Sequence, residues 1–106
     1  MDEQMARQFD TGAHRSDDRA KPDYEGYLSP LVIRRFGEYM LLHQYSGKRT
    51  SDNWQKGIPM DAYMKSAWRH FLAWWDGHRA GHVDEEALCG LLFNVQGYLH
   101  ESLKRR

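Results

Sequence analysis

Apolar residues recur at steps of three and four along three segments of this chain, and this helical period constrains the fold more than any other feature. In the first segment Ile33, Phe36 and Met40 fall on one stripe. We therefore expect an all-α fold with three principal helices, at about residues 29–44, 61–77 and 84–103.

Polar and turn-forming residues mark where these helices begin. Ser29 precedes Pro30, and a capping hydroxyl followed by proline is typical of a helix start. Asp61 and Asp84 are the expected caps of the second and third helices. We expect an N-terminal arm at residues 1–28, a single helical domain at residues 29–106, and within it a long functional loop at residues 46–59.

Length and composition limit the class of protein. The chain has 106 residues, of which 41% are hydrophobic, and this is enough for one folded domain. Cys89 is the only cysteine, so no internal disulfide can form. No apolar run resembles a signal peptide or approaches the roughly 20 residues of a membrane span. These features predict a cytoplasmic protein without a membrane partner.

Charge is unevenly distributed, although the net charge is zero. Residues 29–82 contain eight basic and four acidic residues. A modestly basic middle suits a small molecule that carries phosphate better than a nucleic-acid duplex, which usually needs a dense basic face. The expected partner is therefore a nucleotide or a nucleotide-like molecule.

The third predicted helix carries a stripe of small and polar residues beside its leucine-rich face. Gly90 and Gly97 flank Asn94 at helical spacing, and Glu86 and Glu101 extend the stripe at its two ends. Glycine inside a helix costs about 1 kcal/mol relative to alanine, so two glycines indicate a backbone that another helix or a ligand approaches closely. Tight helix packing around a buried Asn94 and a binding role for Asn94 are equally good interpretations.

The second predicted helix has an aromatic face that we expect to pack inward. Its members are Met64, Ala67, Trp68, Phe71, Trp74 and Trp75. Three helices bury little surface on their own, and these tryptophans offer a subunit interface. The sequence therefore predicts a homo-oligomer.

A few side chains are candidates for chemistry by residue type. His70 is either a hydrogen-bonded core residue or a catalytic or metal-binding group. Glu38 is either an exposed ion-pair partner of neighbouring arginines or a carboxylate ligand for Mg²⁺. Trp54 lies in the loop between Asn53 and Lys56, where an aromatic ring beside an amide and a cation suits a base and a phosphate.

Several short motifs, taken in order along the chain, resemble those of one known family. They are Thr11-Gly12-Ala13 with Arg15, Lys21-Pro22 with Tyr24, the loop Asn53-Trp54-Gln55-Lys56-Gly57-Ile58-Pro59, then Ser66-Ala67-Trp68-Arg69-His70, and Leu92-Phe93-Asn94. Together they cover roughly residues 9–103. They look like the phage-associated dATP/dGTP diphosphohydrolase N-terminal domain, a relative of the all-α MazG-like nucleotide pyrophosphohydrolases.

The resemblance implies hydrolysis of a purine deoxynucleoside triphosphate to the monophosphate and pyrophosphate. It also implies Mg²⁺ or Mn²⁺ held by acidic residues on helices, and a phage-encoded protein that acts in the host cytoplasm. By matching positions, the resemblance assigns substrate binding to Asn53, Trp54, Lys56, Arg69 and Asn94.

The sequence departs from the MazG-like enzymes at the metal site. Their two helical motifs, ExxE and ExxD, are absent, and His43 stands where the family commonly has glutamate. Either Glu38, Glu86 and His43 form a variant metal site, with Glu38, His70 and Glu86 as catalytic groups, or this branch binds a nucleotide without cleaving it. A phage accessory protein that sequesters a nucleotide is therefore the second hypothesis, and a helical scaffold or interaction protein is the third.

Overall fold

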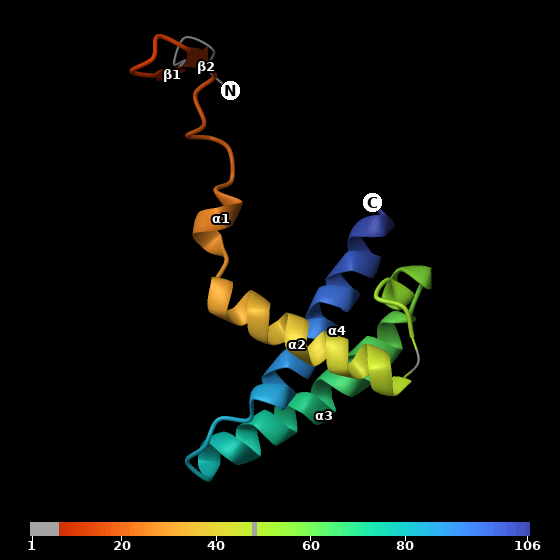
Figure 1. Cartoon of the computed structure of the whole chain (residues 1–106). Coiled ribbons are helices and arrows are strands. Elements are labelled where there is room, and N and C mark those ends of the chain that lie inside the picture. The colour runs from red at the N-terminus through yellow and green to blue at the C-terminus, as the bar shows by residue number, and fades with distance from the viewer. Residues whose placement is uncertain (1–6, 48) are drawn as a thin grey trace. The chain divides into compact units, whose positions relative to one another are not determined.

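The computed structural model describes residues 7–47 and 49–106, and it confirms the all-α fold. Helices α2 (Pro30–Gly47), α3 (Met60–Arg79) and α4 (Glu85–Lys104) are the three principal elements (Figure 1). The described residues fall into two compact units, one ending at Pro30 and the other spanning Leu31–Arg106. The smaller elements are strands β1 (Arg7–Gln8) and β2 (His14–Arg15), helix α1 (Tyr24–Tyr27) and the 3₁₀ helix η2 (Asn53–Lys56).

The first unit contains a small antiparallel hairpin that the sequence pattern did not predict. Arg7 pairs with Arg15 and Gln8 pairs with His14. The backbone N–H of Phe9 donates to the carbonyl of Ala13 at 2.9 Å, and Gly12, at a φ of 88°, supplies the left-handed conformation that the turn requires.

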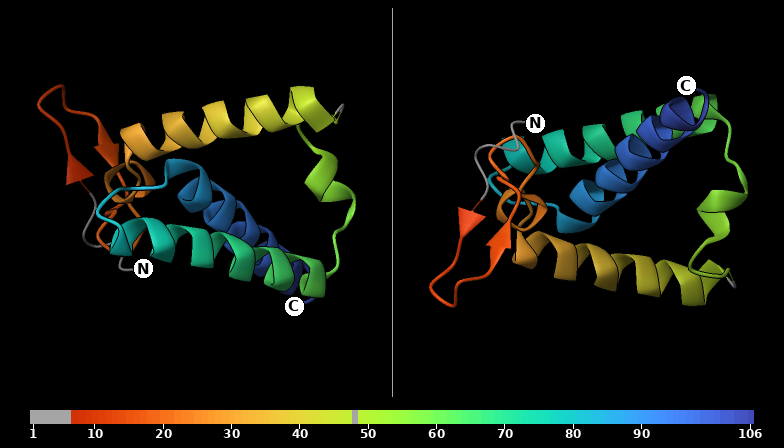
Figure 2. Two further views of the ribbon diagram at one scale, coloured as in Figure 1. Left: turned by 90° about the horizontal axis from the view of Figure 1, so that it is seen from below. Right: turned by 90° about the horizontal axis from the view of Figure 1, so that it is seen from above.

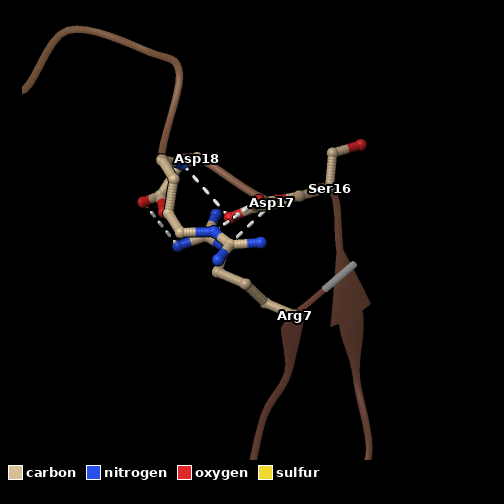
Figure 3. Close-up of polar contacts among 5 residues, drawn as sticks. Arg7, Ser16, Asp17 and Asp18 are labelled. Atoms are coloured by element: carbon tan, nitrogen blue, oxygen red, sulfur yellow. Dashed lines mark hydrogen bonds and ion pairs between the residues drawn. The ribbon is translucent and has the colours of Figure 1, made fainter. Parts of the chain in front are cut away.

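Charged side chains hold the segment that follows the hairpin. The Arg7 guanidinium donates to the Ser16 carbonyl at 3.1 Å and to the Asp18 carboxylate at 2.9 Å (Figure 3). Asp17 is buried and accepts from Arg19 Nε at 2.8 Å, and this hydrogen bond lowers the pKa of Asp17 below its usual value. The expected arm therefore contains local ordered structure.

Helices α3 and α4 form an antiparallel pair, which is the main helix contact of the second unit (Figure 2). They are joined by a short turn in which Gly81 has a φ of 88°. Asp84 caps α4 as expected, because its carboxylate accepts from the backbone N–H of Ala87 at 2.9 Å. Asp61 does not cap α3, since that helix starts one residue earlier, at Met60 after Pro59, and leaves Asp61 in the first turn.

The glycine stripe of α4 is where α3 approaches closely. A Cβ atom at Gly90 would collide with the ring of His70, and one at Gly97 would collide with the ring of Tyr63. Asn94 lies buried between the two glycines, and its side-chain amide donates to the Gly90 carbonyl at 2.7 Å. Tight helix packing around a satisfied amide is thus the geometry at this stripe.

The prediction that the aromatic face of α3 packs inward is wrong for most of its residues, although Ala67 and Trp74 are half-buried. Trp68 is 60% exposed and Trp75 is 48% exposed, whereas Tyr63 and Gly77 are the buried residues of this helix. Gly90 and Gly97 of α4 let the rings of His70 and Tyr63 approach the α4 backbone directly. Because these two residues face α4, most of the aromatic face of α3 points away from it.

Helix α2 contacts this pair through a few side chains. Its Tyr39 is buried, and Arg35 Nε donates to Glu85 Oε1 of α4 at 2.7 Å. In the part of the chain that the structure describes, no helix is both long and apolar enough to cross a membrane.

Candidate functional site

A cavity of about 310 Å³ lies between α2, the loop that follows it, and α4. Residues of α2 at helical spacing form one wall, residues of the loop form a second wall, and Phe93 of α4 also lines the site. Its lining residues are Gly37, Met40, Leu41, His43, Gln44, Arg49, Thr50, Ser51, Asn53, Trp54, Ile58 and Phe93.

The polar part of the cavity is suited to an anion. Arg49 supplies a permanent positive charge, and none of the lining residues is Asp or Glu. The Arg49 side chain lies against Gly47, at the C-terminal end of α2. Gln44 and Asn53 add amide groups that can both donate and accept hydrogen bonds.

The loop wall is fastened to the last turns of α4. The rings of Trp54 and His100 meet edge to face with centroids 4.7 Å apart. The backbone N–H of Ile58 donates to Glu101 Oε1 at 3.2 Å. Gly57 lies between Trp54 and Ile58 in the chain, and its φ of 105° is a conformation that glycine adopts most readily. The loop motif thus gives the cavity one aromatic and one aliphatic side chain in a fixed arrangement.

Three of the residues predicted from sequence line this cavity. Asn53 and Trp54 are half-buried in its loop wall, and His43 contributes from α2. The ring of His43 packs on Tyr39, with centroids 4.2 Å apart. Two predicted substrate-binding residues and one predicted metal ligand therefore share one site.

The other predicted substrate-binding residues lie elsewhere. Lys56, at the end of η2, is exposed and does not line the cavity. Arg69 is exposed on α3, and Asn94 is buried in the contact between α3 and α4. Their binding roles stay predictions.

Glu38 and Glu86 are exposed, but both lie within electrostatic reach of Cys89. Burial raises the pKa of the Cys89 thiol, and Arg35 opposes this effect. The carboxylates of Glu85, Glu38 and Glu86 raise that pKa further. The acidic candidates thus share electrostatic influence on one buried thiol of α4.

His70 is half-buried against Gly90. Burial lowers its pKa below the usual 6.5, and the positive charges of Arg69 and His43 lower it further, while Asp84 opposes them. His70 and His43 therefore lie within electrostatic reach of each other, and a neutral imidazole is favoured at His70.

The candidate metal ligands Glu38, His43 and Glu86 come from two helices, α2 and α4. Among residues 7–47 and 49–106, no group of three or more His, Cys, Asp or Glu side chains is placed to hold a metal ion. Glu38, Glu86 and His43 are therefore not gathered into one ligand set within this chain.

Sequence reasoning missed Arg49 and Gln44. Arg49 belongs to the expected functional loop at residues 46–59, but it falls outside the motif at residues 53–59. Gln44 shares a face with Gly37, Met40 and Leu41, and that helical spacing was the available signal for a polar residue at the end of an apolar wall.

Comparison with known proteins agrees with the resemblance in the motifs. The family model described as dATP/dGTP diphosphohydrolase, N-terminal, matches residues 7–99, which is most of the chain. No curated protein and no solved structure gives a significant match. The chain therefore belongs to the dATP/dGTP diphosphohydrolase N-terminal domain family.

Proposed function

We propose that this protein binds a purine deoxynucleoside triphosphate in the cavity between α2 and the loop. The observation that carries the proposal is the joint presence of Trp54, Arg49 and amide side chains in a site whose lining has no carboxylate. An aromatic face suits a base, a guanidinium suits phosphate, and amides can read the edge of a base.

The dimensions of the cavity support a single nucleotide as its occupant. Small-molecule sites usually have volumes of about 300–1,000 Å³, with mostly apolar walls and a few placed polar groups. This cavity, at about 310 Å³, lies at the lower end of that range and matches that composition. A base, a sugar and the nearest phosphate would fill it, and the outer phosphates would extend toward solvent.

Family membership supports hydrolysis to the monophosphate and pyrophosphate as the reaction. The acidic and histidine candidates for this chemistry are Glu38, Glu86, His43 and His70. Because the described residues contain no group of three or more side chains placed to hold a metal ion, sequestration of the nucleotide without cleavage is the second candidate function.

Exposed apolar side chains support a homo-oligomer. In the helical unit the buried hydrophobic residues are Tyr39, Tyr63, Ala87 and Cys89. Tyr39 and Tyr63 are the large side chains among these four, so the helical unit covers few large apolar side chains fully by itself. Large apolar side chains stay exposed on all three helices, and a second copy of the chain would cover them.

The experiment is to incubate the purified protein with each deoxynucleoside triphosphate, with Mg²⁺, with Mn²⁺ and with a chelator. Chromatography measures monophosphate and pyrophosphate, and thermal melts measure binding. Release of pyrophosphate establishes the enzyme, and intact nucleotides that raise the melting temperature establish sequestration. If neither occurs, both functions are refuted and the scaffold hypothesis is favoured.

A pair of tryptophan variants ties the result to the cavity. Trp54→Ala should raise the Kd for the preferred nucleotide about fivefold or more, since stacking on a base contributes about 1–3 kcal/mol. Trp68→Ala is the matched control, because Trp68 is exposed on α3 and does not line this cavity. Equal loss of affinity in both variants would contradict binding in the cavity.

A further inference from the structure

We propose that Glu101 is a positioning residue, whose carboxylate holds the loop wall of the cavity in its binding conformation without touching the nucleotide. This inference rests on the proposed function, because it concerns the same cavity. Glu101 is the last member of the small polar stripe of α4, and the packing between α3 and α4 does not explain why a carboxylate stands there.

The side chain of Glu101 is an anchor rather than an exposed charge. Only 5% of the residue is exposed. One oxygen, Oε1, accepts from the backbone N–H of Ile58 at 3.2 Å, and the other, Oε2, pairs with Lys104 Nζ at 2.9 Å. A carboxylate can accept at both oxygens at once, which is what this arrangement requires.

The contact reaches the cavity through the short motif that precedes Ile58. Ile58 lines the cavity, and Trp54, four residues earlier, lines it too. Trp54 packs on His100, the neighbour of Glu101 on α4. The loop wall is thus fastened at two points to consecutive residues of one helix, by an aromatic contact and by a backbone hydrogen bond.

The charges around Glu101 favour its ionised form. The hydrogen bond from Lys104 is the largest influence and lowers the pKa of Glu101. Burial opposes it, but the N–H of Ile58 and the nearby His100 lower the pKa further, so the net shift is downward. Tyr63 of α3 also lies within electrostatic reach of this carboxylate. The Glu101 carboxylate is therefore charged at neutral pH.

Three variants separate anchoring from general stability. Glu101→Ala removes both contacts of the side chain. Glu101→Gln keeps a carbonyl oxygen that can accept from Ile58. Lys104→Ala removes the ion pair and leaves the Ile58 hydrogen bond, so it controls for the loss of the charge pair.

The first readout is hydrogen exchange of the Ile58 amide, measured by NMR in the free protein. We expect exchange to be at least tenfold faster in Glu101→Ala than in the wild-type protein, and close to wild-type in Glu101→Gln. Unchanged protection in Glu101→Ala would overturn the anchor itself, whether or not any nucleotide binds.

The second readout is the Kd for dGTP, measured by calorimetry together with urea unfolding. Loss of the anchor should raise the Kd about two- to tenfold in Glu101→Ala, with near wild-type affinity in Glu101→Gln and Lys104→Ala. Equal affinity in Glu101→Ala and the wild-type protein would overturn the coupling to the cavity. If the wild-type protein bound no nucleotide, the proposed function would fail, and the coupling would fail with it, while the exchange result would still decide the anchor.

Discussion

Replacing Gly97 by alanine tests the close approach of α3 and α4. A Cβ atom at this position would overlap the ring of Tyr63, including its Cε1 and Cζ atoms. That ring is 2% exposed and meets Phe93 edge to face at 5.9 Å between centroids, so it has little room to move aside.

The expected magnitude follows from two opposing effects. Overpacking in a well-packed contact costs about 1–3 kcal/mol, and here the upper part of that range applies because a ring must move. Alanine favours the helix over glycine by about 1 kcal/mol. We therefore expect Gly97→Ala to lower the free energy of unfolding by about 1–2 kcal/mol.

Gly37→Ala is the matched control. Gly37 also lies inside a helix, but a Cβ atom there would meet nothing within 4 Å. The same substitution should then raise the free energy of unfolding by about 1 kcal/mol. Urea unfolding of both variants at one protein concentration is the assay. Equal stabilisation of both variants would refute the close contact, and Tyr63→Leu should relieve the loss in Gly97→Ala if the contact is real.

Three further predictions concern single side chains. The Tyr63 hydroxyl is buried without a hydrogen-bond partner in the described structure, so Tyr63→Phe should raise the free energy of unfolding by about 1 kcal/mol in urea titrations. Burial lowers the pKa of His70 below 6.5, so just below pH 6.5 the unfolded chain binds a proton at this residue that the folded chain does not. The free energy of unfolding should therefore fall as the pH drops below 6.5, and it should fall less in His70→Gln. Thermal melts at a series of pH values measure this. Lys104 lowers the pKa of Glu101 below 4.5, so the stability that this carboxylate contributes should be present above pH 4.5 and lost as the pH falls below it. The free energy of unfolding should depend less steeply on pH in Glu101→Gln.

Helix positions could be read from the sequence because each helix carries its own signals. Asp84 caps α4 as its spacing predicted, and the stripe through Gly90, Asn94 and Gly97 marked a close backbone contact. The residues of α3 that pack against this stripe could not be predicted. Large aromatic residues usually mark a core, and here the glycines favour Tyr63 and His70 at the contact while leaving Trp68 exposed.

The candidate site was predictable in the loop motif, which is continuous in sequence, and at His43 of α2, which the family resemblance had marked. Asn53 and Trp54 belong to one short loop and reach one cavity together. Arg49 and Phe93 come from segments far apart in the chain, and only the folding of α2 and the loop against α4 brings them to the same site. The spacing of residues within one helix or loop does not predict contacts between segments that are distant in sequence.

Binding in the cavity is tested most directly by calorimetric titration of dGTP into the wild-type protein, Arg49→Gln and Arg69→Gln. Both substitutions remove one guanidinium. The cavity assigns the phosphate to Arg49, whereas the motif resemblance assigns substrate binding to Arg69, which is exposed outside the cavity. We expect Arg49→Gln to raise the Kd about tenfold or more and Arg69→Gln to leave it within about twofold, since a hydrogen bond to a charged group contributes about 1.5–3 kcal/mol. Loss of affinity in Arg69→Gln with unchanged binding in Arg49→Gln would contradict a nucleotide site in this cavity.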